Sequence, residues 1–427
     1  MRSILLYSYK EHGSSRWNLA CIDSRTRRIV VSTPLFWTSI SVDYRDYKGQ
    51  DFESLLELLR TQLRRCGPVV PLSVAWLTST TERHMARLLQ LFIDNNAPLN
   101  RWKRLIVKAN GIFPTAMLNQ ERLGEFTRLE RLVIAGSYPH FFFHHLEKTQ
   151  NLENLKELTV HSELVPYDEL SMALPRVMSA IKKLEIKTRS TFSLGIEPNI
   201  FALKCDKLEK HCRFPHLQEL TVNTCSIQLK PASIPLVTHL DVHFRLADPD
   251  PLVVTFPALT SLVLRCAMKD LRPLTWLDAP NLVSIKIDAA STLTKTPSHG
   301  DAPSNEELEF LSYPRVSKLE IYIHLYSAEL HCLLPHFPAA RFMTIPLNVG
   351  FPFELVTGLL DLLIDCNPAE RDVTGDILYK ELEIVEVLSV RDVDFDAEEW
   401  KAAKKTVPSR LLNSKLRKVT VNPIKWT

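Results

Sequence analysis

A short apolar phrase that recurs along most of the chain constrains its fold more than any other feature. In each copy an apolar residue, two mostly polar residues, a second apolar residue, a spacer and a third apolar residue follow one another, as in Trp102–Val107. Twelve copies occur, and they begin at residues 102, 129, 155, 181, 217, 237, 259, 282, 316, 340, 385 and 416. The last two apolar positions lie two residues apart, so on a strand both side chains point to the same face. One short strand cannot bury that face alone, and the recurrence therefore predicts a stacked array of parallel strands.

The spacing of the copies indicates the kind of array. From one copy to the next the second apolar position advances by 27, 26, 26, 36, 20, 22, 23, 34, 24, 45 and 31 residues. Most steps match the leucine-rich-repeat period of roughly 20 to 29 residues. The longer steps predict insertions, one of them with a helix over Phe353–Ile364. The predicted fold class is an α/β solenoid, an irregular leucine-rich-repeat horseshoe over residues 101–427 with a small helical N-terminal cap.

Prolines stand two residues before six consecutive copies. They are Pro215, Pro235, Pro257, Pro280, Pro314 and Pro338. Because proline lacks an N–H group and disfavours helix in the preceding residue, each is expected to end the preceding segment and lead the chain into a strand. Four of them follow an aromatic residue, and we expect these aromatic rings to pack under the strands. The four are Phe214, Phe256, Tyr313 and Phe337.

Residues 49–100 have a different pattern and are predicted to cap the array. Phe52–Arg65 carries apolar residues at helical spacing and is followed by Cys66-Gly67-Pro68, which ends a helix. Pro71–Trp76 predicts an extra strand, and Thr81–Ile93 predicts a second helix. Since the exposed end of a strand array needs a cover, a helical lead-in is expected whatever the function.

Charge, cysteine usage and missing motifs narrow the function classes. Lys+Arg 52 against Asp+Glu 49 favours neither a nucleic-acid nor a membrane partner. The eight cysteines are scattered without paired spacing, which favours reduced thiols in the cytoplasm or nucleus. No apolar run reaches the ~18 to 20 residues of a membrane span. The sequence contains no glycine-rich phosphate loop, nucleophile elbow or His-Glu-x-x-His motif, so we expect no cofactor and no enzymatic activity.

Alternation within each strand predicts which residues face outward. Side chains that flank the buried pair point to the opposite, concave face of the array, where we expect a protein partner to bind. The candidate residues on this face are Lys108, His161, Lys187, Asn223, His239, Asp241, His243, Arg265, Asp288 and Tyr322. Arg265 and Tyr322 are the preferred anchors, because interface hot spots favour Arg and Tyr. A solvated, unoccupied strand face is the alternative for each single residue.

One cluster on this face suggests an enzyme instead. His239-Leu-Asp241-Val-His243 places two imidazoles and a carboxylate on one side of a strand, and these groups can ligate zinc or transfer protons. Same-face neighbours on a strand lie about 6 to 7 Å apart, so the two imidazoles are expected roughly 13 Å apart, too far for one metal ion. A metal-dependent enzyme is therefore the less favoured alternative, and we assign no metal site.

The segment ahead of the array carries a family resemblance. Residues 27–40 read Arg-Arg-Ile-Val-Val-Ser-Thr-Pro-Leu-Phe-Trp-Thr-Ser-Ile, and the helix predicted at 52–65 follows. This layout resembles fungal F-box/leucine-rich-repeat proteins, in which the end of the F-box carries Arg-x-Ile-Ala, Ser-Thr-Pro, a Leu-Trp pair and Ser-Ile. The Leu-Pro-x-Glu start of an F-box does not occur in residues 1–19, so residues 1–48 resemble a truncated or degenerate F-box.

The resemblance implies a function. In that family the F-box docks a Skp-type adaptor of a cullin-based ubiquitin ligase, while the repeats hold the protein to be ubiquitylated. By that resemblance the chain would be the substrate receptor of such a ligase, with an adaptor, a cullin and an unidentified protein substrate as partners. Its adaptor-binding residues would be Ile29, Pro34, Leu35 and Trp37. The alternative is a repeat scaffold without adaptor contact, in which these four residues only pack the cap against the first repeat.

Overall fold

The computed structural model divides the 427-residue chain into two compact units, Met1–Asp206 and Lys207–Thr427. It describes residues 20–43, 52–77, 82–108, 123–136, 152–162, 180–188, 199–206, 213–225, 234–244, 253–266, 271–289, 308–323, 325, 327–347, 382–389 and 418–423. The helix predicted over Phe353–Ile364 lies outside these residues.

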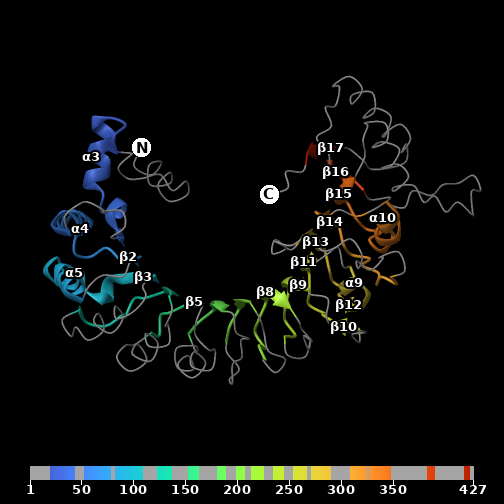
Figure 1. Ribbon diagram of the computed structural model, residues 1–427, viewed down its shortest axis with the longest axis horizontal. Coiled ribbons are helices and arrows are strands. Elements are labelled where there is room, and N and C mark those ends of the chain that lie inside the picture. Colours follow the sequence, from blue (N-terminus) through green and yellow to red (C-terminus); the bar gives the residue numbers. More distant parts are fainter. Residues whose placement is uncertain are drawn as a thin grey trace, which may run out of the picture. The chain divides into compact units, whose positions relative to one another are not determined.

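The first unit is built on an open parallel sheet whose strands pair in sequence order (Figure 1). The strands are β1 (Ser39–Val42), β2 (Leu72–Trp76), β3 (Trp102–Lys108), β4 (Arg131–Ala135), β5 (Glu157–Ser162), β6 (Lys183–Thr188) and β7 (Ala202–Cys205). The register keeps the apolar phrases aligned, because Leu105 pairs with Leu132 and Leu132 pairs with Leu158. These leucines are at most 1% exposed, so each strand buries its apolar pair against that of the next strand.

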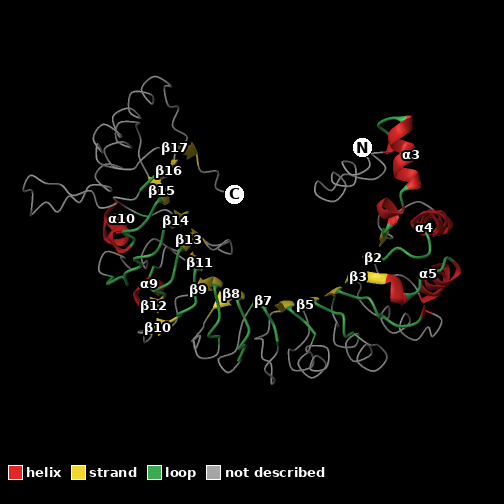
Figure 2. Ribbon diagram, turned by 180° about the vertical axis from the view of Figure 1, so that it is seen from behind, coloured by secondary structure: helices red, strands yellow, loops and turns green. Residues whose placement is uncertain are grey.

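Helices gather at the amino-terminal end of this unit, as Figure 2 shows. They are α3 (Ser24–Ser32), η1 (Pro34–Trp37), α4 (Phe52–Cys66), α5 (Glu82–Asp94) and η3 (Leu99–Arg101). Helix α4 packs on η1 and α5 and buries Leu55 and Leu59 completely. It ends at Cys66, and Gly67 follows with a positive φ of 70°, the conformation expected of a glycine that stops a helix. The two helices and the strand predicted between residues 52 and 93 are thus confirmed.

The second unit repeats the same construction. Its main sheet contains β8 (Glu219–Cys225), β9 (His239–Phe244), β11 (Ser261–Cys266), β13 (Ser284–Ala289), β14 (Lys318–Ile321), β15 (Phe342–Leu347), β16 (Ile384–Ser389) and β17 (Lys418–Pro423), all parallel and in this order. Strands β10 (Val254–Thr255) and β12 (Leu277–Asp278) form a separate pair. The short helices are α9 (Pro273–Trp276), α10 (Ser327–Leu333) and η8 (Leu334–His336). Leu262 pairs with Leu240 and with Ile285, so these phrases again lie in register. The copy predicted to begin at residue 385 is wrong by three residues, because Met343 pairs with Val385 and not with Leu388.

The prolines occupy a β-turn that precedes each strand. The amide of Leu217 donates to the carbonyl of Phe214 at 3.2 Å, which places Pro215 at the second position of the turn, where its fixed φ is favoured. The same bond recurs in the other copies that carry the proline. The residue before each proline is buried, including all four aromatic residues expected under the strands. The proline therefore shapes the turn, and the flanking apolar residues anchor that turn in the core.

Two strands of the first unit lie where the sequence analysis expected none. Strand β7 pairs with β6 through Leu203 and Leu184, inside the step of 36 residues that was predicted to hold an insertion. That prediction is wrong, because Leu203 divides the step into two short ones of 19 and 17 residues. Strand β1 pairs with β2 and extends the sheet into the segment that resembles an F-box. The chain is thus an α/β fold of open parallel sheets with few helices.

Candidate binding faces of the two sheets

Strand alternation leaves one side of each sheet less covered than the other. In β11 the burial pattern is strictly alternating, with Leu262, Leu264 and Cys266 buried and the residues between them half-exposed. We define the first-unit face as the side chains that flank the buried pairs in β2–β7, and the second-unit face as their equivalents in β8–β16, with Tyr322 directly after β14. Because register is kept, these side chains form rows across neighbouring strands.

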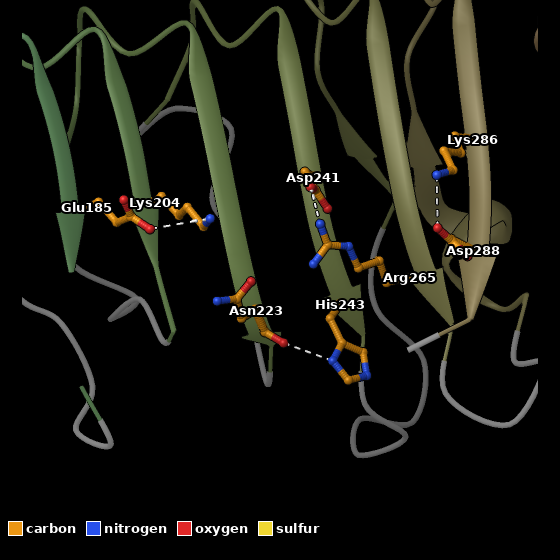
Figure 3. Close-up of polar contacts among 8 residues, drawn as sticks. All are labelled: Glu185, Lys204, Asn223, Asp241, His243, Arg265, Lys286 and Asp288. Carbon is orange, nitrogen blue, oxygen red and sulfur yellow. Dashed lines mark hydrogen bonds and ion pairs between the residues drawn. The ribbon is translucent and has the colours of Figure 1, made fainter. Parts of the chain in front are cut away.

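The preferred anchor Arg265 is held by an ion pair on the second-unit face (Figure 3). Its Nη2 lies 2.6 Å from Oδ2 of Asp241 on the neighbouring strand. The register places Arg265 opposite His243 and Asp288, so the pair to Asp241 runs diagonally. Two of the residues predicted to contact a partner therefore form an ion pair with each other within the protein.

The two histidines of the cluster His239, Asp241 and His243 have different surroundings. His243 is 4% exposed, and its Nδ1 lies 2.8 Å from the backbone oxygen of Asn223 (Figure 3). His239 is exposed, with Nδ1 2.9 Å from Oγ1 of Thr238. Across the described part of the chain, no group of three or more His, Cys, Asp or Glu side chains is placed to hold a metal ion.

Tyr322 belongs to a compact polar cluster on the second-unit face. Nζ of Lys286 lies 3.0 Å from Oδ2 of Asp288 (Figure 3) and 4.7 Å from the centre of the Tyr322 ring. The Tyr322 hydroxyl donates to Glu320 at 3.3 Å, and Lys318 reaches the other oxygen of Glu320 at 2.8 Å. Burial and the charge of Glu320 raise the pKa of Tyr322 to about 12. Both predicted contact residues here, Asp288 and Tyr322, are half-exposed and fixed by neighbours.

On the first-unit face the cationic side chains share few carboxylates. Glu185 lies 3.2 Å from Lys187 and 3.4 Å from Lys204, and Figure 3 draws its contact to Lys204. Burial alone would raise the pKa of Glu185, but the two lysines outweigh burial and lower it. The predicted residue His161 is half-buried. The side chain of Lys108 lies outside the described residues.

Arg104 is a residue that the sequence analysis did not single out. It pairs in register with Arg131, whose Nε lies 3.3 Å from Glu157. No ion pair to Arg104 occurs among the described residues, and its buried Nε finds no hydrogen-bond partner among them. Burial and the adjacent Arg131 lower the pKa of the Arg104 guanidinium, and Glu157 opposes them in part. Many strand positions carry a charged residue, so the sequence alone does not distinguish Arg104 from the others. The register beside Arg131 and the buried Nε atom do so.

The four residues expected to touch an adaptor differ in exposure. Trp37 is 1% exposed, its Nε1 donates to the carbonyl of Val30 at 2.9 Å, and the Arg65 guanidinium lies 4.5 Å from its ring. Ile29 and Pro34 are half-buried, whereas Leu35 is 40% exposed. Trp37 therefore belongs to the core of the cap, and Leu35 is the most accessible of the four.

Comparison with protein-family models and with curated proteins finds no match to the chain. Within the described residues no helix has the length and apolar character to cross a membrane. Any functional assignment therefore depends on the residues and geometry of the chain itself.

Proposed function

We propose that the chain is a protein-recognition module with the architecture of an irregular leucine-rich-repeat horseshoe. It would serve as the substrate receptor, and thus a non-catalytic subunit, of a Skp–cullin–F-box ubiquitin ligase in the cytoplasm or nucleus. The observation that carries the recognition role is the set of in-register rows of polar side chains on one side of each open sheet. The ligase role rests on the resemblance of residues 27–40 to the end of an F-box.

The chemistry of the rows suits a protein partner. Arg265, Tyr322 and His239 present long side chains fixed by ion pairs and hydrogen bonds, so little side-chain entropy is lost when a partner binds. His243, also expected on this face, is buried. Neighbouring strands lie about 4.8 Å apart, so one face offers many evenly spaced contacts to an extended segment or a protein surface. Arg and Tyr are also the residue types enriched at interface hot spots.

The adaptor contact is the part of the proposal that a single substitution can test. Leu35 is 40% exposed in η1, two residues before the buried Trp37, and Val31 is 38% exposed in α3, next to Val30, which accepts the hydrogen bond of Trp37. We expect a Skp-type adaptor to co-purify with the full chain and Leu35→Asp to abolish the complex, because a buried carboxylate without a partner is costly. Leu236→Asp is the matched control, since Leu236 is 46% exposed in the second unit. An adaptor that never co-purifies with the wild-type chain would contradict the ligase role.

A scaffold without adaptor contact is the second candidate, and one observation favours it. Phe36 and Trp37 are buried in the cap, and η1 packs on α4, so this segment has a structural task of its own. The scaffold predicts that the chain binds a protein through its strand faces and that no adaptor joins the complex. The same co-purification separates the two candidates.

A further inference from the structure

The two faces differ in charge. Of the described side chains on the first-unit face, five are cationic and two are anionic, whereas the second-unit face has three cationic and five anionic side chains. The second-unit cations each have a carboxylate within 3.0 Å, as the pairs of Arg265, Lys286 and Lys318 show. On the first-unit face, the cationic side chains therefore outnumber the carboxylates that could pair with them.

The excess of cationic over anionic side chains is most pronounced at Arg104. Among the described residues, the guanidinium that pairs with it in register is that of Arg131, a like charge that already forms an ion pair with Glu157. A buried guanidinium N–H group without an acceptor carries a desolvation penalty, and a nearby second guanidinium adds repulsion. A carboxylate arriving between the two residues would relieve both effects, since the planar fork of Arg matches a carboxylate bidentately.

Apolar side chains stand directly beside this cationic pair. Ile106 and Val133 lie two residues further along the same strands and pair with each other in register. Ile106 is half-exposed, and Val133 is 8% exposed. Same-face neighbours on a strand are about 6 to 7 Å apart, which equals the distance between side chains i and i+2 of an extended peptide. Together the four residues form a charged subsite next to an apolar one.

We propose that the first-unit face at β3 and β4 binds an extended acidic peptide segment of the partner protein. A carboxylate of the segment lies between Arg104 and Arg131, and an apolar side chain two residues away packs on the half-exposed Ile106, beside the buried Val133. The recognised pattern is Asp or Glu, any residue, then an apolar residue, in either chain direction. This inference rests on the proposed recognition function and names the chemical class of its partner.

The test uses the full chain and a random peptide library displayed on phage. Peptides that the wild-type chain enriches are sequenced, and the strongest is synthesised with a fluorescent label for anisotropy titrations. The enriched peptides are expected to carry Asp or Glu two residues away from an apolar residue. Arg104→Gln weakens binding about 10-fold or more, as expected for the loss of a hydrogen-bonded charge pair. Arg315→Gln, the matched control at an exposed arginine in the turn before β14 and outside both faces, leaves the affinity within about 2-fold.

The outcomes separate the inference from the proposed function. Arg131→Gln serves as a second variant, and circular dichroism verifies that each variant is folded. Enriched peptides without an acidic class, or equal losses in Arg104→Gln and Arg315→Gln, would overturn the acidic-segment site and leave protein recognition intact. Equal displacement by a short single-stranded oligonucleotide and by an unlabelled peptide would also overturn it. A wild-type chain that enriches no peptide would count against both.

Discussion

Single residues in this protein fall into two groups with different tasks. In the sheet interiors, Leu262 and Ile285 touch one another across neighbouring strands and are at most 1% exposed. On the opposite side, residues such as Asp241 and Arg265 are half-exposed and hold one another by charge. Substitutions in the first group should therefore change stability, and those in the second group should change binding.

The interior group gives a direct stability prediction. Ile285→Ala should lower the free energy of unfolding by about 2–5 kcal/mol, because it removes buried methyl groups and leaves a cavity between β11 and β14. Ser284→Ala, one residue away on the other side of the strand, should change it by less than about 0.5 kcal/mol. Urea denaturation followed by circular dichroism measures both values. Equal losses of stability in the two variants would contradict the assignment of Ile285 to the buried side of β13 and Ser284 to the half-exposed side.

Tyr322 gives a prediction on pH dependence. Its pKa rises from an ordinary value of about 10 to about 12, because burial and Glu320 disfavour the phenolate. The folded state therefore holds the proton more tightly than the unfolded state does. The stabilisation is fully present below pH ~10 and is lost as pH rises from there towards 12. Wild type should lose more stability across this window than Tyr322→Phe, as urea midpoints at several pH values would show; parallel curves would contradict it.

Residue-scale prediction from sequence had a clear limit. Alternation correctly placed Arg265 and Asp241 on the half-exposed side of their strands, since side chains on a strand alternate with period two. That Arg265 is already paired depends on a diagonal contact between two strands, which needs the register. The burial of Trp37 likewise depends on packing against α4, and no local pattern predicts it.

At the scale of elements, the turn and the strand act as one unit. The turn from Phe256 to Leu259 buries its first and last residues and exposes Pro257 at its corner. The next strand then begins two residues after Leu259. One sequence pattern, the apolar phrase preceded by proline, specifies both the turn and the strand that follows it. It therefore predicts well where the strand starts.

Strand β7 shows why this pattern missed one element. Ile200, Leu203 and Cys205 occupy the three apolar positions and are all buried, and Pro198 stands two residues ahead. The phrase differs from the others because Cys205 takes the place of an aliphatic residue, and Phe201 and Ala202 take the place of the two mostly polar residues. Cysteine is among the most buried residue types, so a pattern that admits it would have found β7.

The end of α4 provides an element-scale prediction. Gly67 has φ of 70°, and a Cβ added there would meet no atom within 4 Å. The cost of Gly67→Ala therefore comes from the backbone alone, roughly 1–2 kcal/mol. Gly67→Asn should cost less, because Asn tolerates this conformation better. Thermal unfolding of the three proteins measures the order; an alanine variant as stable as wild type would contradict it.

At the scale of the whole molecule, two units carry faces of opposite charge within a chain whose formal net charge is only +3. Overall composition favoured no charged partner because the two contributions nearly cancel. The division between the units follows Asp206, whereas the sequence suggested boundaries at residues 48 and 100 from changes of pattern. Chain-wide counts therefore could not predict the local cationic excess, which depends on which residues share a face.

Hydroxyl-radical footprinting with bound peptide most directly tests whether a strand face is the recognition surface. The labelled chain is compared with and without the strongest selected peptide, and the modification of exposed apolar and aromatic side chains is quantified by mass spectrometry. Protection is expected at face residues of the first unit, first of all at Ile106. Protection confined to Leu236 in a turn or to Val253, with the face residues modified as before, would contradict it.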